Sequence, residues 1–369
     1  MTPNAQQARA RALMDLYAQA EEQVLKVIAQ HLGDPEDTPV WAQKKLSEIR
    51  RVRAAIGEIL EKLESQSGPM RDQMILDAWR GGYDAFAEEM RALGVEIDGA
   101  GQGALNRADA LLRDAASQMD AVHTRILRES DDIYRQVLAD AIPMANLGVE
   151  TVRQAAQRAL NAFAMRGITA FVDKAGRSWG MAEYAEMAAR TGMMRAAISG
   201  YTQDAIDHGE DLVIVSDHAD ECPLCAVWEQ KILSLTGAKR NAPGCAGTVA
   251  DATKAGLFHP NCEHSVTVYV PGLTRVEPGK SRTRKADAEG YKNRQHQRYM
   301  ERTLRQWKRR QAAALTPEEE RKCKAHVDMW RDRIKRFANE NDLPRLRHRE
   351  GGRVVLSDAA RKIKPIKLG

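Results

Sequence analysis

Aromatic residues are scarce in this sequence, and long apolar runs are missing from it. Phe, Trp and Tyr make up 5% of the 369 residues, whereas hydrophobic residues make up 43%. So few large side chains favour an elongated protein of long helices with modest local cores over a compact enzyme. No stretch of about 18 uninterrupted apolar residues occurs, and the N-terminal residues lack the charged and apolar regions of a signal peptide. We therefore expect a soluble protein with no membrane span, no export signal and no membrane partner.

Cysteine is sparse as well, and its placement argues against a disulfide framework. The chain has five cysteines, an odd number, and four of them lie between residues 222 and 262. Disulfide-bonded domains use even numbers of cysteines in oxidising compartments, whereas clustered cysteines in a reducing compartment are typical of metal sites. The cysteine distribution therefore indicates metal binding.

Neither sign of charge dominates the whole chain, but its two ends differ strongly. The net charge is +5, yet residues 274–369 contain 28 Lys and Arg against 13 Asp and Glu, or +15, and residues 1–273 contain 28 against 38, or −10. A basic arm of this kind fits a polyanion or an acidic protein surface. It fits equally well a solvated helical face balanced by acidic groups. Charge alone leaves these interpretations open.

The N-terminal region has the spacing of amphipathic helices. Apolar residues recur every three or four positions over residues 5–31, 41–63, 70–93, 104–142 and 151–165. Gly and Pro residues at 33–35 and 67–69 predict that the first two helices end there and that helical hairpins result. The glycine-rich residues 98–103 predict a loop, and no strand precedes them as one would in a phosphate-binding loop.

The second half of the chain changes character twice. Residues 168–179 predict a β-hairpin because a β-branched and aromatic run meets a glycine-bearing turn, and a long helix ending at Gly209 follows. Beyond residue 271 the chain is basic and helical, with one helix over residues 285–315. Thr316 as N-cap and Pro317 as the first helical residue predict a second helix, which runs to about residue 339.

These patterns predict a protein that is mainly α with a small α+β module. We expect three parts: an N-terminal helical region over 1–145, an α+β module over 146–273, and a basic C-terminal helical hairpin and tail over 274–369. No internal repeat at a fixed period occurs.

Two apolar, β-branched runs enclose the strongest chemical signal in the sequence. Residues 212–215 and 266–270 predict strands at the two ends of the stretch 211–271. The cysteines and histidines of this stretch lie between these strands. The natural prediction is a pair of strands joined by a metal-binding loop.

Two short-spaced ligand pairs lie in that loop. Cys222 and Cys225 form a C-x2-C pair, and His259 and Cys262 repeat the two-residue gap. Zinc takes four ligands tetrahedrally, and each pair can supply two because the backbone between them turns tightly around the ion. His264 follows Cys262 by two positions, so it points to the same side and competes with His259 for the fourth position. We expect one structural Zn²⁺ per chain, with the choice between the two histidines open.

Other interpretations of these residues are weaker. Cys245, in a glycine-rich loop, and Cys323, inside a predicted helix, lack partners, so we do not expect them to be ligands. His208 and Glu210 precede the C-x2-C pair roughly as the H-x-E motif precedes that of zinc deaminases. Four protein ligands would leave no open position for a reacting water, so we expect no enzyme. The alternatives are a reduced C-x2-C turn without metal, a zinc-ribbon nucleic-acid-binding protein and, remotely, a zinc deaminase or hydrolase.

Three stretches taken together carry a family resemblance. They are DKAGRSWGMAEYAEMAARTG at 173–192, LFHPNCEHSVTVYVPGL at 257–273, and QHQRYMERTLRQWKRRQ at 295–311 with a later RLRHREG at 345–351. In this order and spacing they resemble the tailed-phage minor capsid proteins of the minor capsid protein 2 group, which are related to the Mu F-like head morphogenesis proteins. The resemblance covers roughly residues 150–351, and the N-terminal region is helical as the family implies.

The resemblance implies a virion structural protein made in the host cytoplasm. Its expected place is the capsid near the portal vertex, where it would act in head assembly, DNA packaging or ejection. The implied partners are the portal protein, the major capsid protein or both, in several copies forming a ring, and packaged DNA is a possible partner of the basic arm.

The family's cysteine and histidine positions fall on all five candidate metal ligands. These residues are Cys222, Cys225, His259, Cys262 and His264. Mu F-like relatives carry Cys-Arg-Cys where this chain has Cys262-Glu263-His264, which favours His264 as a ligand and leaves His259 unresolved.

Overall fold

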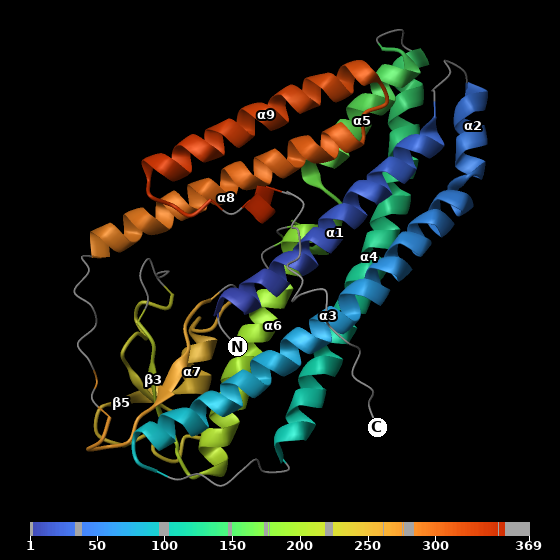
Figure 1. Ribbon diagram of the computed structural model, residues 1–369. Coiled ribbons are helices and arrows are strands. Elements are labelled where there is room, and N and C mark those ends of the chain that lie inside the picture. The colour runs from blue at the N-terminus through green and yellow to red at the C-terminus, as the bar shows by residue number, and fades with distance from the viewer. Residues whose placement is uncertain are drawn as a thin grey trace. The chain divides into compact units, whose positions relative to one another are not determined.

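The computed structural model is mainly α with a small α+β module, which confirms the predicted fold class. It describes residues 3–33, 39–95, 103–146, 150–172, 176, 178–217, 224–260, 262–274, 276, 284–345 and 347–350. The helices are α1 (Pro3–Leu32), α2 (Pro39–Ser47), α3 (Ile49–Ala92), α4 (Gly103–Asn146), α5 (Val152–Arg166), α6 (Met181–Asp207), α7 (Val249–Lys254), α8 (Arg284–Ala312) and α9 (Pro317–Glu340), with a short 3-10 turn η1 (Arg347–Glu350). The strands are β1 (Thr169–Val172), β2 (Ser178–Gly180), β3 (Leu212–Val215), β4 (Ile232–Ser234), β5 (Cys245–Thr248) and β6 (Val266–Val268) (Figure 1).

The chain divides into two compact units, each built from three segments. Unit 1 consists of Met1–Ala10, Met70–Ala116 and Met187–Gln295, and unit 2 consists of Arg11–Pro69, Ser117–Glu186 and His296–Gly369. Unit 1 contains the four-stranded sheet, and unit 2 contains the β1–β2 hairpin and most of the α8–α9 pair. Within the described ranges, no helix combines the length and the apolarity that crossing a bilayer requires. The glycine-rich loop predicted over 98–103 falls outside the described residues except for Gly103.

Helix α3 is continuous where the sequence predicted a break. Residues 49–92 form one helix with Pro69 inside it (Figure 1). Pro69 is exposed, whereas Ser67 before it and Met74 after it are buried, so both halves of the helix keep the same buried stripe. Proline has no N–H to donate, so the carbonyl four residues before it loses its helical hydrogen bond. On the solvent side this carbonyl is open to water, and packing of the stripe outweighs the local cost. The predicted helix end at 67–69 is therefore wrong.

Two arginines of α8 bind buried carboxylates within unit 2. Arg305 Nε donates to Glu183 Oε1 at 3.1 Å, and Arg309 Nη1 donates to Glu21 Oε2 at 3.4 Å. The backbone N–H of Ile168 donates to the other oxygen of Glu21 at 2.9 Å. Removing one member of such a buried pair leaves a desolvated charge and costs about 3 to 5 kcal/mol. Part of the positive charge of the C-terminal arm is thus neutralised inside the fold.

Helices α8 and α9 form the predicted hairpin and run side by side (Figure 1). The Thr316 side chain caps α9 by accepting a hydrogen bond from the Glu319 backbone N–H at 3.2 Å, which confirms the predicted start. The hairpin core consists of Met300, Leu304, Val327 and Ile334. Tyr299 is 51% exposed, because the core-facing stripe of α8 passes through the next residue, Met300.

The sheet of unit 1 has the strand order β5-β4-β3-β6. Strand β3 pairs antiparallel with both β4 and β6, and Val213 lies opposite Val268 while Val215 lies opposite Val266. The predicted outer strands therefore pair directly with each other. Strands β4 and β5 and helix α7 were not foreseen, because elements of three to six residues are too short to show an apolar alternation or a helical period.

Both faces of this sheet are covered, which explains why β3 reads as an unbroken apolar run. One face packs on α3 and α6 of unit 1 in a cluster that includes Phe86, Met90, Tyr201, Val213, Val215, Leu233, Leu257, Phe258, Val266 and Val268. The other face is a small cluster of Leu212, Ile214 and Ile232. The hydroxyl of Tyr201 accepts a hydrogen bond from the backbone N–H of Val268 at 2.7 Å and donates to Glu89. This contact gives the backbone N–H of Val268, on the edge strand β6, a hydrogen-bond partner, and it holds β6 against the helices.

Asp211 organises the loop that follows β4. Its Oδ1 accepts hydrogen bonds from the backbone N–H and the hydroxyl of Thr236, both at 2.7 Å. Its Oδ2 accepts from the Ser234 hydroxyl at 2.5 Å and the Lys239 backbone N–H at 2.8 Å. Burial opposes ionisation, but these four hydrogen bonds prevail and lower the pKa of Asp211 to about 2.

Replacing Asp211 by alanine is expected to lower the free energy of unfolding of unit 1 by about 3 kcal/mol, because charged hydrogen bonds are lost and their donors are left buried. Urea denaturation followed by tryptophan fluorescence measures this. The folded pKa lies below the ordinary value of 3.8, so the carboxylate stabilises the fold above that pH and its contribution disappears as the pH falls toward 2. The wild-type protein and Asp211→Ala should therefore converge in stability in this acidic range, and a constant difference across it would contradict the assignment.

Candidate metal centre

Three potential metal ligands converge at one end of the sheet. Because β3 and β6 are antiparallel neighbours, the segment that leaves β3 after Val215 and the segment that enters β6 before Val266 lie at the same end of the sheet. Cys225 belongs to the first segment, and Cys262 and His264 belong to the second. The sheet therefore brings together residues that are 37 positions apart in the chain.

The spacing of these ligand atoms fits a tetrahedral zinc ion. The sulfur atoms of Cys225 and Cys262 are 3.7 Å apart, and the Cys262 sulfur lies 3.4 Å from Nδ1 of His264. Zinc–sulfur bonds of about 2.3 Å and zinc–nitrogen bonds of about 2.0 to 2.1 Å at tetrahedral angles place two sulfurs about 3.8 Å apart, and a sulfur and a nitrogen about 3.6 Å apart. Neither cysteine is part of a disulfide bond. The group of Cys225, Cys262 and His264 can therefore hold a metal ion.

The environment favours the thiolate, which is the ligand form, of Cys262. All three residues are buried, with 1%, 8% and 5% of their surface exposed in the order Cys225, Cys262 and His264. The hydrogen bond with Cys225, followed by the interactions with His264, lowers the pKa of the Cys262 thiol to about 4 although burial opposes this. A thiolate is the form that binds zinc, so Cys262 is prepared for coordination.

Glu229 orients the imidazole of His264. Its Oε1 lies 2.6 Å from Nε2 of His264, and both side chains are largely buried. A proton on Nε2 shared with this carboxylate leaves the lone pair of Nδ1 directed toward Cys262. Burial opposes protonation of the ring, but the hydrogen bonds to Cys262 and Glu229 raise the pKa of His264. Glu229 could not be predicted from the sequence, because a single glutamate four residues after Cys225 has no distinguishing pattern.

Of the two other predicted ligands, only His259 lies among the described residues, and it does not belong to this group. Cys222 lies outside the described residues. His259 is only partly buried, and its Nδ1 lies 2.8 Å from the carbonyl oxygen of Pro260. Cys245 donates to the Gly247 carbonyl oxygen at 3.2 Å, and Cys323 is buried in α9. The roles of Cys222 and His259 stay predictions.

The residues that suggested a deaminase lie elsewhere in unit 1. The Nδ1 atom of His208 is 2.9 Å from the carbonyl oxygen of Asp204, and its ring lies 5.9 Å from that of Phe86. Neither His208 nor Glu210 belongs to the metal-binding group found among the described residues. The geometry of these residues therefore does not support the comparison with the zinc deaminase motif.

Comparisons with known proteins extend the resemblance found in the sequence. The family described as phage minor capsid protein 2 matches residues 1–339. A structural protein of Lactococcus phage LL-H is 26% identical over 220 residues, which make up 57% of this chain and 59% of that protein. A structural protein of Lactococcus phage mv4 is 33% identical over 94 residues, or 25% of this chain and 76% of that protein. No solved structure matches the chain.

The extent of these matches decides the family. The match to the LL-H protein covers less than two thirds of that protein's length, whereas the family match covers all but the last thirty residues of this chain. It includes all of unit 1, unit 2 as far as residue 339, the metal-binding group and all but the last residue of the α8–α9 hairpin. The chain therefore belongs to the phage minor capsid protein 2 family and is a minor structural component of the phage virion.

Proposed function

We propose that the protein is a zinc-containing structural component of the phage head that acts at the portal vertex during head assembly, DNA packaging or ejection. The observation that supports the structural role most directly is the family match over residues 1–339. A ring of several copies contacting the portal protein, the major capsid protein or both is the arrangement that we infer. The role is mechanical, and catalysis is no part of it.

The zinc ion in this proposal is held by Cys222, Cys225, Cys262 and His264. Three of these residues form the buried group described above, and Cys222 would complete the C-x2-C pair. His259 is left out because it is only partly buried and does not belong to the group of ligand atoms that lie close together among the described residues. Four protein ligands make the ion structural, since no position remains for a reacting water. X-ray absorption spectroscopy tests this: a coordinated, exchangeable water would instead favour a deaminase or hydrolase.

Removing Glu229 is expected to weaken zinc binding without removing a ligand. Glu229→Ala should lower the zinc affinity about 10- to 100-fold, because His264 loses the carboxylate that orients it. Glu229→Gln should lose less zinc affinity than Glu229→Ala, since its amide oxygen can still accept the hydrogen bond from Nε2–H of His264. Competition with a chromogenic chelator measures both.

Glu263 provides a matched control for this test. Its side chain is 53% exposed, it lies between two of the proposed ligands, and it pairs with Arg190 at 2.9 Å. Glu263→Ala removes the same charge near the ion without touching His264, so its zinc affinity should stay within about 3-fold of wild type. Equal losses in Glu263→Ala and Glu229→Ala would mean that general charge, and not orientation, sets the affinity.

The position in the virion is tested on intact particles. Cryo-electron microscopy of purified phage should show density for this protein at the portal vertex only, and affinity-tagged portal protein should recover it from lysates of infected cells. Density at every capsomer, or only along the tail, would contradict the proposed position. Neither outcome depends on whether zinc is bound.

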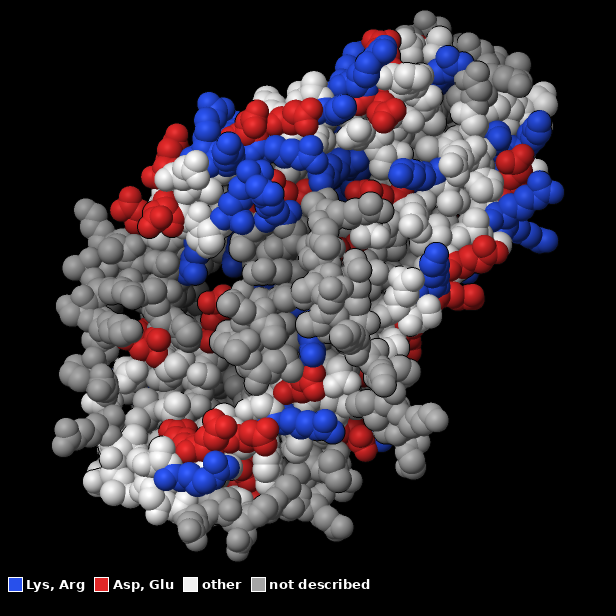
Figure 2. All heavy atoms as spheres, viewed as in Figure 1, with Lys and Arg blue, Asp and Glu red and all other residues white. Residues whose placement is uncertain are grey.

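A zinc-ribbon nucleic-acid-binding protein is the second candidate. The +15 charge of residues 274–369 motivates it, and Lys and Arg side chains gather over α8 and α9 with acidic side chains among them (Figure 2). This candidate predicts tight duplex binding with a steep salt dependence together with absence from portal complexes. Recovery of this protein together with the portal protein would favour the structural role over this candidate.

A further inference from the structure

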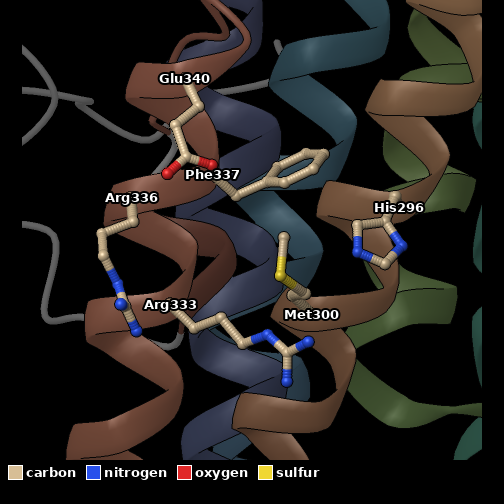
Figure 3. A pocket seen from close by; sticks show the side chains of 6 residues that line it. All are labelled: His296, Met300, Arg333, Arg336, Phe337 and Glu340. Carbon is tan, nitrogen blue, oxygen red and sulfur yellow. The ribbon is translucent and has the colours of Figure 1, made fainter.

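A pocket of about 310 Å³ lies between α8 and α9 within unit 2. Figure 3 shows His296 and Met300 on α8, facing Arg333, Phe337 and their neighbours on α9. The Phe337 ring and the Arg333 side chain extend from α9 toward α8. The Met300 side chain is fully buried and Phe337 is partly buried, so they form an apolar floor, whereas Arg333 lies exposed at the opening.

The pocket presents cationic groups in a fixed arrangement. Arg333 places its guanidinium carbon 5.1 Å from the centre of the Trp330 ring, and the His296 ring lies 4.9 Å from that of Phe337. Stacking on an aromatic ring restricts a guanidinium without using its N–H donors. Arg336 adds a second exposed guanidinium group on α9. Planar donors that are held in place beside an apolar floor suit an oxyanion, especially a phosphate.

The exposed face of α9 carries charges of both signs. Its exposed acidic residues are Glu318, Glu320, Asp328, Asp332 and Glu340, of which Glu318 pairs with Lys322 and Asp328 with Arg331. Unlike Arg305 and Arg309, which bind buried carboxylates, the basic residues of α9 are exposed. They are Arg321, Lys322, Lys324, Arg331, Arg333, Lys335 and Arg336. A helix of 24 residues spans about 36 Å, so a polyanion lying along it can meet several of these charges at once. One carboxylate, Glu340, lines the pocket and opposes such a ligand.

We propose that this pocket binds a backbone phosphate of duplex DNA, with Arg333 and Arg336 as the contacting residues. The proposal rests on the proposed function in one respect only: a phage virion encloses DNA and so supplies the ligand. The arginines neutralise one phosphate group and its neighbour, and counterions are released from the duplex. Helix α9 beyond the pocket adds weaker, exposed charge contacts.

The test compares two double variants of the full chain that remove equal charge from the same helix. Binding of a short fluorescent duplex is measured by anisotropy over a range of salt concentrations. Arg333→Ala/Arg336→Ala should lower the affinity about 10-fold and reduce the slope of log affinity against log salt by about 1 to 2. Arg321→Ala/Lys324→Ala, outside the pocket, should change the slope by less than about half as much. Glu340→Gln should tighten binding about 2-fold by removing the opposing charge.

Three outcomes would overturn the proposal. Equal losses in the two double variants would show that charge acts without a site. Displacement of the duplex by polyglutamate at equal charge would identify an acidic protein as the partner. Absence of duplex binding by the wild-type chain would exclude DNA, while recovery with the portal protein would still stand as the separate test of the proposed function.

Discussion

Replacing Cys262 by serine is expected to abolish zinc binding and to loosen the sheet of unit 1. The Cys262 sulfur lies 3.7 Å from the sulfur of Cys225 and 3.4 Å from Nδ1 of His264. The substitution therefore removes the ligand atom that lies near both of the others. Structural zinc contributes to folding directly, and loss of a ligand is expected to cost about 4 to 5 kcal/mol or more. Metal analysis should give about one zinc per wild-type chain and none for Cys262→Ser. Amide hydrogen exchange should accelerate in β3 and β6.

Cys245→Ser is the matched control for this prediction. Cys245 is a free cysteine in the same sheet, partly exposed, and its thiol only donates to a nearby backbone carbonyl. This variant should keep its zinc and its exchange protection. If Cys262→Ser retained one zinc per chain, the proposed ligand set would be wrong. If Cys245→Ser lost zinc, the ligand set would have to include β5.

Replacing Gly82 by alanine is expected to separate two helices of unit 1. A Cβ atom on Gly82 would lie 1.9 Å from the carbonyl oxygen of Ala197, and one on Gly200 would lie 2.1 Å from that of Trp79. Helices α3 and α6 therefore cross at two glycines where backbone touches backbone, and no side chain can move aside. The expected loss is about 3 kcal/mol or more for either Gly→Ala variant. Thermal denaturation followed by circular dichroism measures it.

Gly57→Ala provides the control within the same helix. A Cβ atom on Gly57 has no atom within 4 Å, so alanine fits freely. Alanine is favoured over glycine inside a helix by up to about 1 kcal/mol, and Gly57→Ala should therefore stabilise the protein. Opposite signs for Gly82→Ala and Gly57→Ala would establish the close crossing. A stabilising Gly82→Ala variant would show that α3 and α6 do not approach so closely.

The two crossing glycines illustrate what a sequence hides. Gly82 and Gly200 each interrupt a helical pattern, and in the sequence they resemble Gly57, which touches nothing. Their importance depends on which backbone lies opposite, and apolar periodicity does not record that. Pro69 illustrates the reverse case, since a strong local signal for a break was overridden by the buried stripe on both sides of it.

Features that depend on local chemistry could be predicted from the sequence. The apolar spacing predicted the helices, Thr316 and Pro317 predicted the start of α9, and the β-branched runs predicted β3 and β6. These succeeded because caps, helical stripes and short apolar runs involve residues within a few positions of one another. The cysteine and histidine spacing indicated candidate ligands, and their binding of zinc stays a prediction.

How residues far apart in the chain combine depends on the tertiary contacts. Pairing of β3 with β6 selected His264 to lie beside Cys225 and Cys262, and it placed Glu229 against the imidazole ring. Docking of α8 buried Arg305 and Arg309 among carboxylates. Packing of α9 on α8 instead left Arg333 at the opening of a pocket. Residues of one type thus receive different roles, because burial and partners depend on contacts between segments that are far apart in the chain.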